Sequence, residues 1–295
     1  MADTLESLQR RISSAQGLGS VVKTMKALAA SNIDQYEMAV KSLQNYFETV
    51  AMSLYACFKA TQYTSQEAKN TGSQTVAIVL GSDQGLVGGF NEVLVDYVQS
   101  KLRLQGGEQV FWVVGERMVS RLSESNLPVK EKFPVPNGVE GIGPLVNELL
   151  INIQSYQEQG ILDSCQIFYN SPTSHIGYTP AVSQVLPFDK QWYTELYVSN
   201  WPTNRLPQII GGLENILPAL ITEYLFVLLY KAIAGSLSSE NASRLQAMQR
   251  AEKNIDETLD DLNQQFNRIR QGAIDAELFD LVAGFEALAP NNPQK

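Results

Sequence analysis

The sequence IDETLDDLNQQFNRIRQGAIDAELFDLVAGFEAL (residues 255–288) carries apolar residues in repeated steps of three and four. The first set is Ile255, Leu259, Leu262, Phe266 and Ile269, and after a slip of one residue the second is Ile274, Leu278, Leu281, Phe285 and Leu288. This spacing is typical of one stripe along a helix. If the helix begins near Pro218, its length is on the order of 100 Å at about 1.5 Å per residue. No single globular core covers such a helix, so it needs a partner along its length.

The other end of the chain supplies that partner, because residues 3–60 also read as one long helix. Its apolar positions form a narrow stripe, as in a coiled-coil seam: Leu5, Leu8, Ile12, Ala15, Leu18, Val22, Met25, Ala29, Ile33, Tyr36, Val40, Leu43, Phe47, Val50, Leu54 and Cys57. Gly17 and Gly19 mark either a bend or a point where another chain comes close. We expect the two ends to pair antiparallel, with the seam ending near the slip after Ile269 and the rest of the C-terminal helix unpaired.

The middle of the chain alternates strands and helices. Strands are predicted at 75–80, 109–114 and 163–170 and helices at 91–104, 116–125 and 142–159, whereas 127–133 is ambiguous between strand and loop. Residues 171–207 are proline-rich and contain edge-strand pieces. The expected fold class is therefore α/β: a long antiparallel coiled coil of the terminal helices with an inserted Rossmann-like α/β domain. The expected domains are the N-terminal helix (1–62), the α/β domain (75–206) and the C-terminal helix (208–289).

Composition narrows the function class. The formal net charge of −9 disfavours a nucleic-acid-binding protein. No signal peptide opens the chain, and the apolar run 216–233 contains Pro218, Glu223 and Lys231, which makes it a poor membrane span. We therefore expect a protein that is cytosolic or is attached to a membrane through other proteins.

The residues that could carry chemistry are few. Cys57 and Cys165 are expected to be buried thiols, and a single His175 predicts no metal site. The loop GSDQGLVGGFN (81–91) stands between a strand and a helix, where phosphate-binding loops occur, but it has neither GxGxxG nor GxxxxGK[ST] spacing. Tight turns and close packing are the favoured interpretation of its glycines. We predict no catalytic residues, cofactor or metal, and a solvated flank for Asp256, Glu257, Asp260 and Asp261.

Three stretches resemble the gamma subunit of F-type ATP synthases. The C-terminal match is carried by Ser239, Glu240, Arg244, Ala247, Met248, Ala251, Asn267, Arg270, Gln271, Ile274 and Glu277. The opening helix resembles the family at Arg10, Arg11, Ile12, Met25, Lys26 and Ala29, and the loop at Ser82, Asp83, Gly85, Leu86, Gly88, Gly89, Phe90 and Asn91. The matches come in the family's order and span nearly the whole chain. Asp34, Gln249 and Asp275 depart from the family pattern, as in the alternate gamma subunits of some bacterial second ATPase operons, and the cysteine-bearing insertion of chloroplast gamma subunits is absent.

The resemblance implies a central-stalk rotor shaft that couples ion flow through the membrane ring to conformational cycling of the catalytic hexamer, without catalysing a reaction itself. Its implied partners are the alpha and beta subunits, the epsilon subunit and the membrane-embedded c-ring, on the cytoplasmic face of the bacterial inner membrane or on a thylakoid. The implied partner-contact residues are Met25, Lys26, Arg268, Arg270, Gln271 and Glu277. On physical grounds alone, an ordinary helix surface and a polar contact ring for an acidic partner are equally good interpretations of the cluster RIRQ (268–271). Two alternatives remain: a coiled-coil adaptor with an α/β docking module, and a Rossmann-like nucleotide enzyme.

Overall fold

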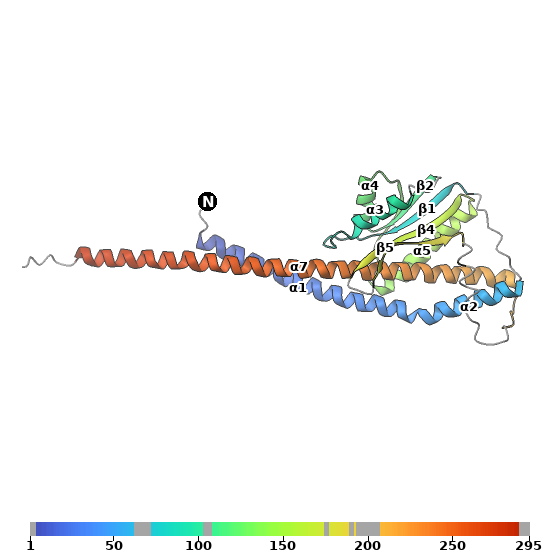
Figure 1. Cartoon of the computed structure of the whole chain (residues 1–295), viewed down its shortest axis with the longest axis horizontal. Coiled ribbons are helices and arrows are strands. Elements are labelled where there is room, and N and C mark those ends of the chain that lie inside the picture. The colour runs from blue at the N-terminus through green and yellow to red at the C-terminus, as the bar shows by residue number, and fades with distance from the viewer. Residues whose placement is uncertain are drawn as a thin grey trace, which may run out of the picture. The chain divides into compact units, whose positions relative to one another are not determined.

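The computed structural model describes residues 4–61, 72–102, 108–173, 177–188, 192 and 207–288. Its contacts divide the chain into two compact units. The larger contains residues 28–245, and the smaller contains residues 1–27 together with 246–295. Two helices, α1 (Leu5–Ser42) and α7 (Leu213–Leu288), belong to both units (Figure 1).

The larger unit is built on a five-stranded sheet of order β3-β2-β1-β4-β5. Its strands are β1 (Gln74–Leu80), β2 (Glu108–Val114), β3 (Val129–Phe133), β4 (Leu162–Pro172) and β5 (Tyr178–Leu186). The first four run parallel, and β5 pairs antiparallel with β4 at the edge. The three predicted strands are confirmed, and the ambiguous segment 127–133 forms the edge strand β3.

Helices cover both faces of the sheet (Figure 1). One face packs on α3 (Phe90–Leu102) and α4 (Glu116–Glu124) through a core that includes Val79, Phe111 and Phe168. The other face packs on α5 (Ile142–Glu158), which follows the short 3-10 helix η1 (Val139–Gly141), and on α7. Nearly every residue of β1 and β2 is buried, as expected for parallel strands covered on both faces.

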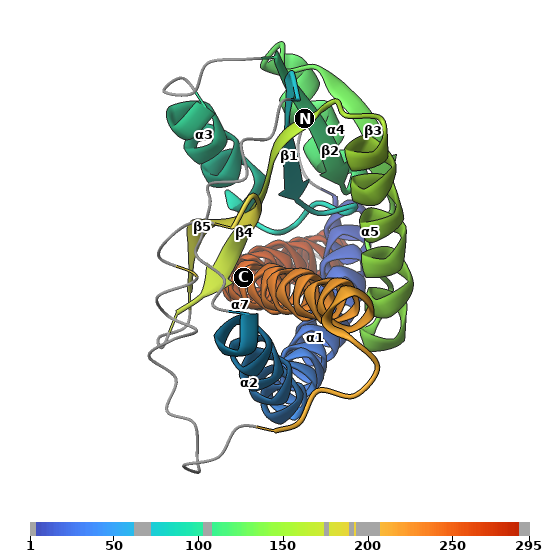
Figure 2. The ribbon, with the colours of Figure 1, turned by 90° about the vertical axis from the view of Figure 1, so that its right-hand side faces the viewer.

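Within this unit, α7 lies between the sheet and α2 (Gln44–Thr61), as Figure 2 shows from the end. Leu225, Leu229 and Ile233 face the sheet core, whereas Tyr224 packs with α2 residues such as Leu54. By length and composition α7 is also apolar enough to cross a membrane. One third of the apolar window that meets this criterion is buried against protein.

The single N-terminal helix predicted over residues 3–60 is wrong in one respect, because a turn at Leu43 separates α1 from α2. The Ser42 hydroxyl donates a hydrogen bond to the carbonyl oxygen of Ala39 at 2.8 Å. A serine that bonds back to its own helix in this way commonly bends it.

In the smaller unit, the first part of α1 packs antiparallel on α7. Leu8 and Leu262 are buried, and a Cβ placed on Gly19 would lie 3.5 Å from Cγ2 of Ile255. Gly19 therefore marks a close approach of the two helices. Leu18, predicted to lie in the seam, is instead 60% exposed. At this point of the seam, the contact with α7 is made by Gly19.

Candidate functional site

The paired part of the smaller unit contains two of the predicted contact residues, Met25 and Lys26, and both are half-buried. The Lys26 ammonium donates a hydrogen bond to Oε2 of Glu252 on α7 at 2.5 Å. This hydrogen bond is the main cause of the lowered pKa of Glu252, and the charge of Lys26 adds to it. Lys26 therefore ties α1 to α7, while Met25 beside it contributes an apolar surface.

The remaining predicted contact residues lie on the unpaired end of α7. Arg268, Arg270, Gln271 and Glu277 are all exposed, as is every residue from 267 to 284. The same segment exposes large apolar side chains, including Phe279 (74%) and Leu281 (61%). Exposed apolar surface bordered by polar and charged residues is typical of a protein–protein contact. The expectation that burial of the seam ends near residue 269 is confirmed, because Leu262 is buried and Phe266 half-buried.

The two groups of residues do not form one patch. Glu252, which binds Lys26, precedes Arg270 by eighteen positions on the same helix, which corresponds to roughly 27 Å. Any partner that contacts both must therefore be long, or there must be more than one.

The Gly-rich loop uses its polar groups within the protein. The Ser82 N–H donates to Oδ1 of Asn91 at 3.1 Å, and the Asn91 amide donates to the Ser82 hydroxyl at 2.9 Å. The Asp83 carboxylate accepts the N–H groups of Glu116 at 2.8 Å and Val135 at 3.1 Å. Positive φ angles at Leu86 (63°) and Gly88 (57°) shape the remaining turn. These contacts favour the packing interpretation of the loop over a phosphate site.

A buried polar cluster beside this loop was not assigned a role from the sequence. It consists of Asn32 and Tyr36 of α1, Asp83 of the loop, and Glu240, Asn241, Ser243 and Arg244 of α7. Arg244 donates to Oε1 of Glu240 at 2.6 Å, although Glu240 is only 5% exposed. Burial raises the pKa of Glu240, the Arg244 guanidinium opposes this, and the charge of Asp83 adds to the rise.

The sequence contains one indication of this cluster. Glu240 and Arg244 stand four residues apart within GSLSSENASR (235–244), a run of small polar residues in the middle of an apolar helix. Small side chains in a helix let the backbone of another segment approach closely. Charged residues in such a run are then buried, and they need each other as ion-pair partners. The resemblance drew attention to Ser239, Glu240 and Arg244, but the spacing alone does not identify the residues that meet them.

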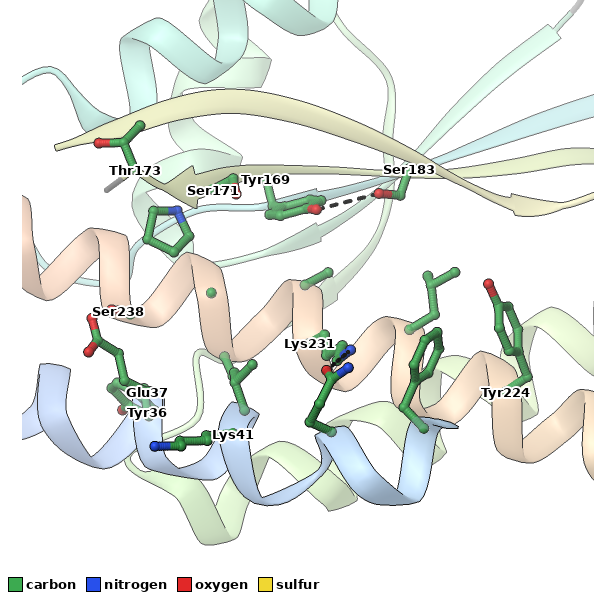
Figure 3. Close-up of a pocket in the computed structure, with 18 residues that line it drawn as sticks. Tyr36, Glu37, Lys41, Tyr169, Ser171, Thr173, Ser183, Tyr224, Lys231 and Ser238 are labelled. Atoms are coloured by element: carbon green, nitrogen blue, oxygen red, sulfur yellow. Dashed lines mark hydrogen bonds between the residues drawn. The ribbon is translucent and has the colours of Figure 1, made fainter. Parts of the chain in front are cut away.

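A cleft of about 780 Å³ lies between α1, α2, α7 and strands β4 and β5 (Figure 3). The Lys231 ammonium donates to Oε1 of Gln44 at 3.0 Å and lies 4.0 Å from the centre of the Phe47 ring. Burial lowers the pKa of Lys231, and the charge of Glu48 opposes this. The labelled hydroxyls of Tyr169 and Ser183 bond each other at 3.4 Å. The lining thus offers several hydroxyls together with the charged side chains of Lys41, Lys231 and Glu37.

The part of the chain that the structure describes holds no group of three His, Cys, Asp or Glu residues able to bind a metal ion. Cys57 and Cys165 are buried, as predicted, and burial raises the pKa of both thiols. His175 lies outside the described residues. The four carboxylates from Asp256 to Asp261 are exposed, as expected for a solvated flank.

Comparisons with known proteins agree over nearly the whole chain. The family model described as ATP synthase matches residues 4–288. The chain is similar to the ATP synthase gamma chains of Ruminococcus albus (26% identical, covering 94% of this chain and 96% of the relative), Clostridium acetobutylicum (27%, 95% and 97%) and Mesoplasma florum (28%, 96% and 98%).

Solved structures extend the similarity to the fold. One chain of the Euglena gracilis mitochondrial ATP synthase rotor is 13% identical, with a TM-score of 0.61, covering 92% of this chain and 98% of its own. A chain of the Tetrahymena thermophila mitochondrial ATP synthase central stalk and c-ring is 22% identical, with a TM-score of 0.56, covering 78% and 99%.

Proposed function

The chain belongs to the ATP synthase family, among its gamma chains, and on this basis we propose that it is the central-stalk rotor shaft of an F-type ATP synthase. In this role it couples ion flow through the membrane ring to conformational cycling of the catalytic alpha/beta hexamer. One observation of the structure carries the proposal: residues 267–284 of α7 present apolar side chains and charges of both signs that no described residue of the chain covers.

A shaft of this kind acts by differential contact. An asymmetric helix end inside a ring of catalytic subunits touches each subunit with different side chains, and so favours a different conformation in each. Turning the helix moves these preferences around the ring. The chain itself needs no reactive residues for this work.

Arg268, Arg270, Gln271 and Glu277 are the proposed contacts to the hexamer from the unpaired end of α7. Met25 and Lys26 are the proposed contacts from the paired part, where Lys26 also binds Glu252. Guanidinium groups suit this task because they form directed bonds with carboxylates and backbone carbonyls.

Different segments of the chain have different roles in the proposed rotor. The terminal segments 1–62 and 208–289 form the shaft, and the α/β domain (75–206) rests on the c-ring together with the epsilon subunit. The complex sits on the cytoplasmic face of a bacterial inner membrane, or on a thylakoid. The gamma chains of bacteria such as Ruminococcus albus and Clostridium acetobutylicum support the bacterial setting.

The test replaces Arg270 and Gln271 by Ala in the assembled complex, with Gln249→Ala/Arg250→Ala as the matched control. The control removes the same two residue types from exposed positions in the paired part of α7. We expect the first variant to lose at least about tenfold in coupled ATP synthesis, which corresponds to about 1.4 kcal/mol, and the control to stay near wild type. Equal rates in the two variants would reject the assignment of Arg270 and Gln271.

The competing function is a coiled-coil adaptor with no rotary role. Affinity purification of the tagged chain from its own cells separates the two. The proposed function requires one copy of the chain for every three beta subunits, whereas an adaptor would be recovered without the catalytic subunits.

A further inference from the structure

We propose that the Gly-rich loop (81–91) and residues 240–244 of α7 form a fixed joint that transmits torque between the α/β domain and the C-terminal helix. This inference rests on the proposed rotor function and adds to it a set of positioning residues. The joint lies within the larger unit, in the last turns of α7 that belong to it.

The direct contact is between Ser243 and the backbone of the loop. The Ser243 hydroxyl donates to the carbonyl oxygen of Val87 at 2.5 Å, and both residues are buried. A Cβ placed on Gly88 would lie 3.6 Å from the Ser243 oxygen. Loop backbone therefore lies against the helix, and the positive φ of Gly88 helps to turn it there.

The loop is braced on its other side by the sheet domain. Asp83 holds the backbone N–H groups of Glu116 and Val135, which follow β2 and β3. The Asn170 amide on β4 donates to the carbonyl oxygen of Phe90 at 2.9 Å. A force applied to the loop by the helix is thereby distributed over the carboxyl ends of several strands.

The helix side of the joint carries a buried ion pair. Glu240 and Arg244 stand one turn apart, and a polar cavity of about 190 Å³ separates them from Asp83 and from Asn137 beyond β3. Asn241 of α7 accepts a hydrogen bond from Asn32 of α1 at 3.4 Å. The polar joint thus brings α1, α7 and the loop together.

The joint can transmit torque because its contacts are polar and therefore directional. The contact between α7 and the sheet core also includes the apolar side chains of Leu229, Ile233 and Leu237, and apolar contacts are non-directional. Hydrogen bonds weaken steeply when their angle changes, and separating a buried charge from its partner is strongly destabilising. The joint therefore holds one rotational alignment of helix and domain.

A weakened joint should lower ATP synthesis most when the ion gradient is small. When the ion gradient is near the lowest value that drives synthesis, part of each rotation would be lost as slip between domain and helix. At a large gradient the same slip matters less. A residue that serves only folding would instead lower synthesis by the same factor at every gradient, in proportion to the amount of assembled complex.

The test measures ATP synthesis by the whole complex in liposomes over graded ion gradients, for Ser243→Ala and for Ser239→Ala. Ser239 is the matched control, because its hydroxyl is buried on the same helix without a hydrogen-bond partner among the described residues. We expect Ser243→Ala to lower synthesis about threefold at the smallest gradient and to approach the Ser239→Ala rate at the largest. If the two variants show the same dependence of ATP synthesis on the ion gradient, the proposal of a joint is wrong.

A cysteine pair gives an independent readout. In Gly88→Cys/Ser243→Cys, the reduced protein lacks the hydroxyl bond, and oxidation with diamide links loop and helix covalently. We expect oxidation to restore low-gradient synthesis to the complex, whereas inhibition on oxidation would mean that loop and helix must separate, and would overturn the joint. If the wild-type chain does not assemble with the catalytic subunits at all, the proposed function fails and the joint fails with it.

Discussion

Replacing Arg244 by Ala removes the countercharge of a carboxylate that is only 5% exposed. Breaking a buried ion pair from one side costs about 3–5 kcal/mol, because the remaining charge is left without a partner. Glu240 can escape this cost by binding a proton. From its ordinary pKa of 4.5, protonation at pH 7 costs about 3.4 kcal/mol, at about 1.4 kcal/mol for each pH unit. We therefore expect Arg244→Ala to lower the free energy of unfolding by about 3 kcal/mol at pH 7.

The sign of the pH dependence follows from the raised pKa of Glu240. Burial raises this pKa above the unfolded value, and removal of Arg244 takes away the interaction that opposes the rise. The folded variant then binds a proton more tightly than the unfolded chain does. The stabilising contribution of that proton is complete below about pH 4.5 and is lost as pH rises through the folded pKa. Relative to wild type, the deficit of Arg244→Ala should therefore shrink in acid.

The assay is urea unfolding followed by tryptophan fluorescence, since Trp112 is fully buried in the core of the larger unit. Glu240→Gln/Arg244→Ala tests the cause, because it removes the unpaired charge along with its partner and should recover about 2 kcal/mol of the loss. Arg250→Ala, an exposed change on the same helix, should stay within about 0.5 kcal/mol of wild type. The reasoning is refuted if the double variant is no more stable than Arg244→Ala.

Three further outcomes are expected. Gly17→Ala should stabilise the chain by about 1 kcal/mol in thermal unfolding, because the glycine is exposed in a helix with open space around it; a lower melting temperature would contradict this. Gly115→Ala should destabilise it by more than about 1 kcal/mol in urea, since its φ is 105° and a Cβ would lie 2.8 Å from the Ser82 carbonyl oxygen; an unchanged midpoint would argue against that strain. Cys165, fully buried with a raised thiol pKa, should react with iodoacetamide at least about a hundredfold more slowly in the native chain than in urea, and comparable rates by mass spectrometry would be inconsistent with its burial.

The strands of the α/β domain were predictable because parallel strands buried on both faces have a plain sequence pattern. Residues 75–80 form an apolar run that ends at Gly81, and the structure places β1 at the centre of the sheet. The edge strand β3 was ambiguous for the opposite reason. Its middle residues, from Lys130 to Lys132, are exposed and charged, and so give no apolar signal.

The breaks in the N-terminal helix were not predictable from periodicity. Steps of three and four continue through Leu43, although the Ser42 hydroxyl bonds to its own helix and a turn follows. Leu18 fits the stripe equally well, yet it is exposed beside the glycine where α7 comes closest. In both places, local contacts decide the geometry, and the apolar pattern does not record them.

The candidate contact surface followed from the sequence more fully than the joint did. The slip in the stripe after Ile269 marked where the seam stops, and the exposed segment 267–284 agrees with it. The joint depends on Ser243 meeting a carbonyl 156 positions earlier in the chain. Only the packing of α7 across the sheet brings these two together, and a single sequence holds no measure of that distance.

The bare end of α7 has a consequence for how the chain is made and handled. Ile274, Phe279 and Leu281 are exposed on one helix that has no cover within the described part of the chain. Side chains of this kind associate with one another in water when no partner shields them. A chain synthesised ahead of its partners would therefore aggregate through this end. Balanced production of the subunits, or coexpression in the laboratory, is then a requirement for soluble protein.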